Sequence, residues 1–247
     1  RLSAGAVIPR FLEMETRHGS IIRGLLQTSG GRGRHPGAGA REPKRTFFVS
    51  FKNGMATLTN ALAASLPQNT IRLGTSVGIG RCPSGEWSVR VEGEREQRFD
   101  AVCLTVSASQ AARLVRDLDG RLSDSLDRLR YESVATINLA FRQSDIGRRP
   151  DGFGFVVPAV EKRSLTACTL TTQKFAGRSA AGHDLVRVFV GGAFGKRHFD
   201  LSDHELRAAV MKDLRDLLGI RAEPLFDSVS RFCRAMPQYD VGHDAWM

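Results

Sequence analysis

Four short apolar segments follow one another in the second half of the chain, with only turns and charged loops between them. They cover residues 134–141, 153–157, 165–171 and 185–191. Parallel neighbours need a crossover of about a dozen residues or more, usually a helix, so strands joined this closely favour antiparallel pairing. The order of these segments therefore predicts a largely antiparallel sheet.

Helical and strand-like patterns alternate around this sheet. Apolar residues at helical spacing predict helices over 6–27, broken at Gly19-Ser20, and over 54–66, where Met55, Leu58, Leu62 and Leu66 form a stripe expected to pack into the core. Two-residue alternation predicts strands over 71–81, 86–93 and 98–107. The last of these is almost entirely apolar from Ala101 to Val106, as in a strand buried on both faces.

The remaining segments complete a mixed fold. Residues 107–118 and 203–218 are expected to be helical, residues 225–232 are expected to form a further strand, and 45–51 also has a strand-like pattern. The fold class predicted is α/β, of the mixed α+β kind, and 247 residues suffice for one large domain or two modest ones.

Charge and cysteine content exclude several functional classes. The net charge is +10, but the arginines are spread along the chain and are often balanced nearby, which favours solvated basic faces over a site for an acidic ligand or a membrane surface. No nucleic-acid partner is expected, because neither a recognition helix nor an aromatic RNA-binding motif is present. The four cysteines lack metal-ligand spacing, so no metal site is expected. No apolar run approaches the roughly 18 residues of a membrane span, so a cytoplasmic protein is expected.

Two glycine clusters resemble nucleotide-binding loops without satisfying their requirements. The segment 191–197, "GGAFGKR", lacks the spacer and the hydroxyl residue of a phosphate-binding loop. The segment 29–45, "SGGRGRHPGAGAREPKR", contains no G-x-G-x-x-G frame and is expected to be a flexible basic loop.

Several segments together resemble a known family. "FFVSFKNGMATLTNALAASL", "DAVCLTVSASQAARLV", "GFGFVVPAVEKRSLTACTLTTQKFAGR", "LVRVFVGG" and "MPQYDVGH" are similar, in this order, to the protoporphyrinogen and coproporphyrinogen oxidases of the flavin-containing amine oxidase superfamily. The resemblance implies part of a FAD-binding, Rossmann-like domain joined to a substrate domain with a largely antiparallel sheet flanked by helices. It assigns residues 1–45 to a helical, membrane-facing region with a basic loop, 46–110 to the FAD domain and 111–247 to the substrate domain.

The resemblance also implies a reaction and a substrate slot. FAD accepts hydrogens from a porphyrinogen, molecular oxygen reoxidises the flavin, and no catalytic side chain is required. The residues implied to line an apolar slot for the flat tetrapyrrole are Phe153, Gly154, Val156, Thr169 and Phe189. The same residues would also suit the ordinary core of a sheet. Since Phe153 and Val156 differ by three positions, their convergence requires a bend near Gly154.

On the cofactor side the resemblance implies that Val77 meets the adenine end of FAD and that His243 or Asp244 lies toward the flavin. The sequence contains neither the glycine fingerprint that binds the FAD pyrophosphate nor the glycine-rich segment expected after "PQY-VGH". It is therefore interpreted as a central fragment that does not retain FAD and is inactive alone.

The partners expected for the intact protein are a porphyrinogen and oxygen, and the family is compatible with peripheral membrane contact and a homodimer. Two alternatives remain open from the sequence. One is another flavin amine oxidase or a carotenoid desaturase, and the other is a non-catalytic module that binds a tetrapyrrole or a lipid.

Overall fold

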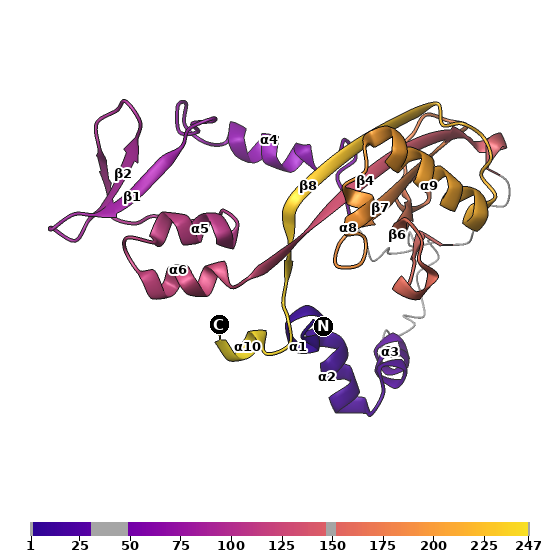
Figure 1. Cartoon of the computed structure of the whole chain (residues 1–247), viewed down its shortest axis with the longest axis horizontal. Helices are drawn as coiled ribbons and strands as arrows, with labels where there is room; N and C mark the ends of the chain where they lie inside the picture. Colours follow the sequence, from indigo (N-terminus) through magenta and orange to yellow (C-terminus); the bar gives the residue numbers. More distant parts are fainter. Residues whose placement is uncertain (1, 31–48, 147–151, 247) are drawn as a thin grey trace, which may run out of the picture. The chain divides into compact units, whose positions relative to one another are not determined.

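The computed structural model describes residues 2–30, 49–146 and 152–246, and the chain divides into two compact units (Figure 1). Unit 1 comprises Arg1–Phe47, Leu73–Arg130 and Gln238–Met247, and unit 2 comprises Phe48–Arg72 and Tyr131–Pro237. The predicted basic loop at 29–45 and the first part of the strand predicted at 45–51 fall mainly outside the described residues.

A five-stranded sheet forms the centre of unit 2. Its strands are β4 (Arg130–Arg142), β5 (Gly154–Val156), β6 (Leu165–Leu170), β7 (His183–Gly191) and β8 (Phe226–Gln238). They lie in the order β5-β6-β7-β4-β8. The pairs β5–β6, β6–β7 and β4–β7 are all antiparallel, which confirms the arrangement predicted from the short connections.

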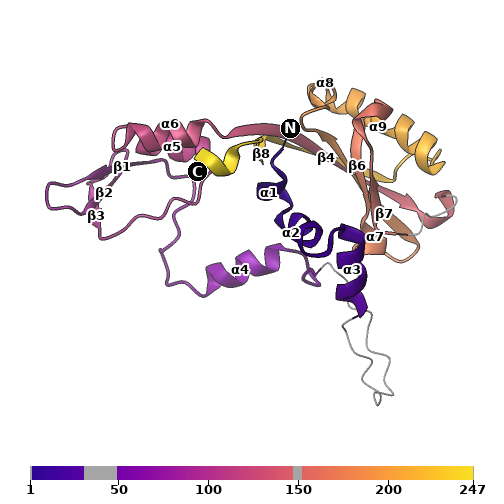
Figure 2. The ribbon, with the colours of Figure 1, turned by 90° about the horizontal axis from the view of Figure 1, so that it is seen from below.

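Helix α9 (Asp203–Leu218) covers one face of this sheet (Figure 2). Its apolar side chains, among them Leu206, Val210 and Leu214, belong to the same buried cluster as the inward-facing strand residues. The helix begins with a capping box, in which the Ser202 hydroxyl accepts from the backbone N–H of Glu205 and the Glu205 carboxylate accepts from Ser202. It ends at Gly219, whose φ of 69° is left-handed. The helix predicted at 203–218 is therefore confirmed at both ends.

Short helical segments connect the strands of unit 2. They are η1 (Gln143–Asp145), η2 (Ala159–Glu161), α7 (Thr171–Lys174) and α8 (Lys196–Phe199), and α4 (Ala56–Ala64) belongs to the earlier part of the unit.

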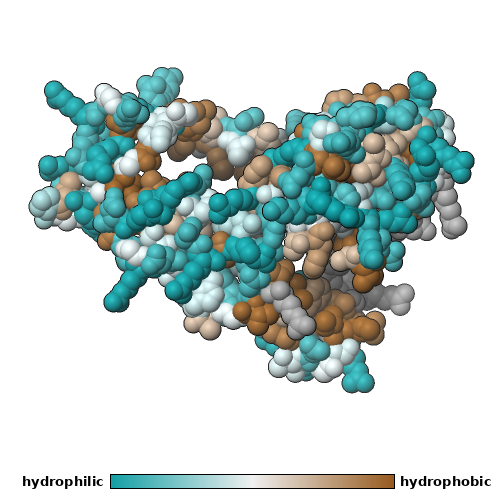
Figure 3. Space-filling model, viewed as in Figure 1, coloured by the Kyte–Doolittle hydropathy of each residue, from teal (hydrophilic) through white to brown (hydrophobic). Residues whose placement is uncertain are grey.

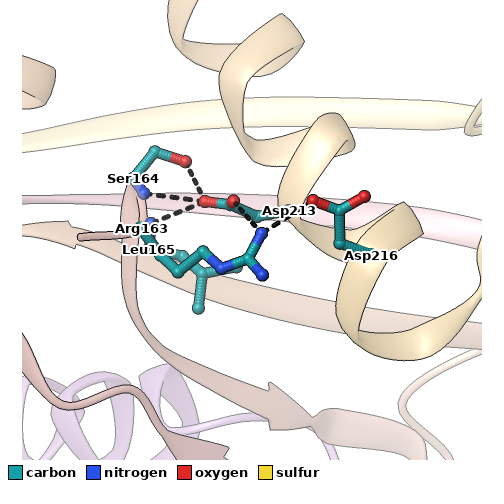
Figure 4. Close-up of polar contacts among 5 residues, drawn as sticks. All are labelled: Arg163, Ser164, Leu165, Asp213 and Asp216. Atoms are coloured by element: carbon teal, nitrogen blue, oxygen red, sulfur yellow. Dashed lines mark hydrogen bonds and ion pairs between the residues drawn. The ribbon is translucent and has the colours of Figure 1, made fainter. Parts of the chain in front are cut away.

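A buried carboxylate joins the start of β6 to α9 (Figure 4). Asp213 is only 5% exposed. Its oxygens accept hydrogen bonds from the backbone N–H of Ser164 at 2.7 Å and of Leu165 at 3.3 Å, and from the Ser164 hydroxyl. Arg163 donates to Asp213 at 3.3 Å and to the more exposed Asp216 at 2.7 Å. One acid thus satisfies several donors that would otherwise be buried without a partner.

The glycine cluster at 191–195 has a structural explanation. Gly191 has φ +107°, and a Cβ there would lie 2.6 Å from the backbone oxygen of Ser133 on β4. A Cβ on Gly195 would lie 2.5 Å from the oxygen of Gly191. Glycine is needed here because two pieces of backbone approach closely, in agreement with the rejection of a phosphate-binding loop.

Unit 1 combines helices with a small antiparallel sheet. Its elements are α1 (Ala4–Val7), α2 (Pro9–His18), α3 (Ile21–Gly30), β1 (Val77–Arg81), β2 (Trp87–Val91), β3 (Gln97–Phe99), α5 (Ala108–Val115), α6 (Gly120–Asp127) and α10 (His243–Trp246). The predicted break between the first two long helices is confirmed, since Gly19 ends α2 with a left-handed φ of 68°.

Three predictions about apolar segments were wrong. The third predicted strand ends at Phe99, and Ala101 to Val106 pairs with no strand among the described residues. A ladder needs a neighbour on at least one edge, and hydrophobic composition alone does not supply one. The stripe on α4 is also not core: Met55, Leu58, Leu62 and Leu66 are 42–58% exposed. Within the described part of the chain, Val49 to Phe51 do not form a strand either.

Replacing Asp213 with alanine should strongly destabilise unit 2. Loss of the carboxylate leaves the N–H groups of Ser164 and Leu165 buried without acceptors, for an expected decrease of about 3 kcal/mol in the free energy of unfolding. Urea denaturation followed by circular dichroism measures this change. The control is Asp216→Ala, which removes the other acid contacting Arg163 at an exposed position and should cost about 0.5 kcal/mol. Equal losses in the two variants would contradict the role given to Asp213.

Candidate functional site

The face of the five-stranded sheet opposite α9 carries two rows of side chains, and we call these two rows the open face. Directly paired residues point to the same side of a sheet. The register places Val156, Ala167, Phe189 and Thr136 in one row across β5, β6, β7 and β4. The second row contains Gly154, Thr169, Arg187 and Asn138.

Burial distinguishes the open face from the face under α9. Residues that alternate with the two rows, such as Ile137, Cys168 and Val188, are at most 2% exposed. Burial also raises the pKa of the Cys168 thiol to about 12, so this cysteine is not a nucleophile at neutral pH. By contrast, Val156 is 78% exposed and Phe189 and Thr169 are half-buried. Apolar area remains available for a ligand on the open face.

Four of the five residues expected to line a substrate slot lie on the open face. Gly154, Val156, Thr169 and Phe189 come from three strands and share one side of the sheet. Their placement together agrees with the expectation that they form one surface. Their contact with a substrate stays a prediction.

Phe153, the fifth residue, lies at the entrance to β5 and outside the two rows. Its backbone oxygen accepts from the N–H of Leu170 at 2.9 Å, and its side chain is 41% exposed. The next residue, Gly154, has φ +151°, and a Cβ there would lie 2.1 Å from the oxygen of Cys168. The chain therefore has an unusual conformation at the position where the sequence required a bend.

The open face is almost free of reactive groups. Its two rows contain no carboxylate, imidazole, thiol or amine, and Arg187 carries the only charge in them. The Arg187 Nε donates to the Asn138 Oδ1 at 2.8 Å. Sequence reasoning missed both residues, although two-residue alternation from Phe189 would have placed Arg187 on the same face.

Unit 2 also contains a hollow that is not lined by the predicted slot residues. Its volume is about 490 Å³, and its lining includes Lys162, Phe194 and Arg197 but none of the five residues predicted to contact substrate. Phe194 is 83% exposed and is a phenylalanine of unit 2 that lies outside the two rows.

The residues predicted to contact the cofactor belong to unit 1. Val77 begins β1, pairs with Val91 on β2 and is 40% exposed. Since β1 is an edge strand of the three-stranded sheet, alternate backbone N–H and C=O groups on its outer edge remain available. This arrangement suits a backbone contact with a planar, hydrogen-bonding group.

His243 is 7% exposed, and its Nδ1 is buried without a hydrogen-bond partner among the described residues. Its ring contacts those of Tyr239 and Trp246, with centroid distances of 4.7 and 4.9 Å. An aromatic setting with one unused ring nitrogen fits a flat polar group such as a flavin.

Asp244 already has a partner within unit 1. Its Oδ2 accepts from the Ser3 hydroxyl at 3.0 Å, while the N–H of Ser3 donates to the oxygen of Tyr239 at 2.7 Å. Nearby, Arg130 pairs with Asp240 at 3.1 Å and lowers the pKa of that carboxyl group. The two bonds of Ser3 join the start of α1 to the segment around α10, and the Arg130–Asp240 pair joins the start of β4 to the same segment. No hydrogen bond within the described residues links Val77 to either His243 or Asp244.

The fold and the open face define a class. It is a mixed α/β protein whose antiparallel sheet presents an apolar row beside a polar row, and neither row contains an acid, base or thiol, as expected where a cofactor supplies the chemistry. Residues 1–246 match the family of flavin containing amine oxidoreductases, and the chain belongs to that family.

Curated relatives are named for porphyrinogen oxidation. The chain is 29% identical to a coproporphyrinogen III oxidase of Bacillus subtilis, over 98% of this chain and 51% of the relative. It is 30% identical to the Staphylococcus aureus protein of the same name, over 98% and 52%. Protoporphyrinogen oxidase 2 of Arabidopsis thaliana is 28% identical over 100% and 52%. The chain spans about half the length of these relatives.

Solved structures agree with the fold. A protein of an Exiguobacterium species, provisionally described as a protoporphyrinogen oxidase, matches the whole chain and 50% of its own with a TM-score of 0.77 and 29% identity. A redesigned putrescine oxidase is similar over 79% of this chain and 40% of its own, with a TM-score of 0.56 and 17% identity, which shows the fold alone. The predictions of the family, the mixed fold, a flavin cofactor and the oxidoreductase class are confirmed.

Replacing Gly154 with alanine should disrupt the pairing of β5 with β6. Both Gly154 and Gly182 have positive φ, at +151° and +75°, but a Cβ at Gly182 would meet nothing within 4 Å. We expect Gly154→Ala to lower the free energy of unfolding by about 3 kcal/mol and Gly182→Ala by about 1 kcal/mol. Urea denaturation measures both values. Similar losses would mean that Cys168 does not approach Gly154 as described.

Proposed function

We propose that the chain is part of a FAD-dependent porphyrinogen oxidase, which converts protoporphyrinogen IX or coproporphyrinogen III to the porphyrin in haem biosynthesis. The observation that carries the proposal is the open face, where an aromatic and apolar row lies beside a polar row that contains no acid or base. The names of the relatives support the same substrate class.

The open face suits a flat tetrapyrrole, because binding such a molecule depends on apolar contact area and does not need reactive side chains. Phe189 offers an aromatic ring, and Ala167 on the neighbouring strand β6 and Val156 on β5 beyond it extend the apolar row to one side. Their role is to hold the macrocycle, orient it and exclude water from one side. When bound, the flavin supplies the hydrogen-accepting chemistry of the reaction.

The cofactor contacts are part of the same proposal. The unused Nδ1 of His243 and the outer edge of β1 at Val77 are the groups of unit 1 that would bind polar atoms of FAD. Asp244 would act through its bond to Ser3, which helps to hold the segment that contains His243.

Molecular oxygen as electron acceptor and assembly as a homodimer follow from the family resemblance alone. Peripheral contact with a membrane has support in the structure, because Ile22 and Leu26 on α3 are 70% and 67% exposed. Figure 3 shows apolar surface over the region of α2 and α3. Within the described residues, no helix is long and apolar enough to cross a membrane.

Porphyrin binding tests the proposal directly. Coproporphyrin III, as the stable oxidised form, should quench the tryptophan fluorescence of the 247-residue chain or change its own absorbance on binding. Phe189→Ala should weaken this binding about tenfold, because the macrocycle loses an aromatic contact. Phe194→Ala removes a more exposed phenylalanine away from the open face and should leave the affinity unchanged.

The melting temperature of each variant must be measured in parallel, because removal of a half-buried ring can also lower stability. Phe189→Leu keeps much of the apolar volume and separates loss of the ring from loss of packing. If the wild-type chain binds no porphyrin, or if Phe189→Ala binds as tightly as wild type, the open face is not the substrate wall.

A further inference from the structure

Arg187 is the one charged residue in the two rows of the open face, and its neighbours indicate a role in binding. It lies two residues before Phe189 on β7, so the two Cα atoms are about 7 Å apart on the same side of the sheet. Thr169 lies directly opposite on β6, and Asn138 lies opposite on β4. The guanidinium of Arg187 therefore lies in the row next to the one that contains Phe189.

Three other arginines of unit 2 form ion pairs. Arg163 pairs with Asp213 and Asp216, Arg207 with Glu223 and Asp227, and Arg231 with Asp203. Arg187 is exposed, and no carboxylate of the described residues lies within ion-pair distance of it. The charge of Arg187 therefore neutralises no acid among the described residues.

The guanidinium of Arg187 is held in one orientation, but most of its N–H groups make no hydrogen bond among the described residues. Its Nε donates to the Asn138 Oδ1 at 2.8 Å, which fixes one side of the planar group. Neither Nη atom has a hydrogen-bond partner among the described residues, and the hydroxyl of Thr169 is also unpaired there. A guanidinium held through Nε presents its remaining N–H groups as a fork, the geometry that binds a carboxylate with two hydrogen bonds.

We propose that Arg187 is the subsite for a carboxylate at the edge of the tetrapyrrole, with Thr169 as a second donor. This inference rests on the proposed function and makes it more specific. A macrocycle that covers Phe189 would bring an edge substituent toward the neighbouring row, where the apolar body of the ligand also reduces water access to the ion pair.

The subsite favours a substrate with a carboxylate on every pyrrole ring. Such a molecule presents an anion to Arg187 whichever ring is placed beside it. A tetrapyrrole with carboxylates on two rings does so in only some orientations, and the others place an apolar substituent against the guanidinium. The substrate class inferred is therefore a tetracarboxylate porphyrinogen of the coproporphyrinogen type.

Binding measurements with matched porphyrins test the inference. Coproporphyrin III carries the carboxylates, and its tetramethyl ester has the same macrocycle without the charges. In one detergent-containing buffer, Arg187→Gln should weaken coproporphyrin III binding about tenfold and leave ester binding unchanged. Arg187→Lys should recover part of the lost affinity, because it retains the charge without the fork.

Arg215→Gln provides the control, since Arg215 is an exposed arginine on α9, on the opposite side of the sheet. It should not change binding of either porphyrin. Raising the salt concentration should weaken coproporphyrin III binding to wild type more than to Arg187→Gln, because screening acts on the ion pair. Melting temperatures confirm that each variant is folded.

The outcomes separate the two proposals. If both porphyrins bind wild type but Arg187→Gln changes neither affinity, or changes both equally, the carboxylate subsite is overturned while the porphyrin-binding wall remains. If wild type binds neither porphyrin, the proposed function fails and the subsite fails with it. Tighter binding of protoporphyrin IX than of coproporphyrin III would overturn the preference for a tetracarboxylate substrate.

Discussion

Packing of α9 against one side of the sheet decides which residues the rest of unit 2 presents to a ligand. Leu206, Val210 and Leu214 share a buried cluster with alternate residues of β4, β6 and β7. Because side chains alternate along a strand, burial of Val188 places Arg187 and Phe189 on the opposite face. A shift of one residue in any central strand would expose the core and bury the open face. The composition of the candidate site therefore depends on this one interface.

The buried Asp213 strengthens the same interface. Apolar contacts alone would not determine the position of β6 along α9. Asp213 receives hydrogen bonds from two backbone groups at the start of β6, so it fixes where that strand begins relative to α9. The bulge between Leu165 and Ala167 follows immediately and brings Ala167 opposite Phe189. A polar contact on one face thus helps to set the register of the apolar row on the other. The anchoring carboxylate therefore lies on the side of the sheet away from the open face.

Sequence patterns predicted the elements of unit 2 well and the environment of isolated apolar segments poorly. The antiparallel order, the ends of α9 and the break at Gly19 follow from local signals: connection length, a capping box and left-handed glycines. The segment from Ala101 to Val106 and the stripe on α4 have equally apolar compositions, yet neither is buried as predicted within the described structure. An apolar composition indicates that burial of a segment is favourable, but a neighbouring element must be present to bury it.

For the candidate site, the sequence by itself determined the residue types, the family and the requirement for an unusual backbone at Gly154, because these depend on local order and local sterics. Only the tertiary structure decided which of these residues lie together. Gly154, Thr169 and Arg187 are far apart in the chain and meet through strand register, whereas Phe153 lies beside Gly154 and falls outside the rows. Register arises from packing between distant segments, so the cation beside the aromatic row could be recognised only after the strands were paired.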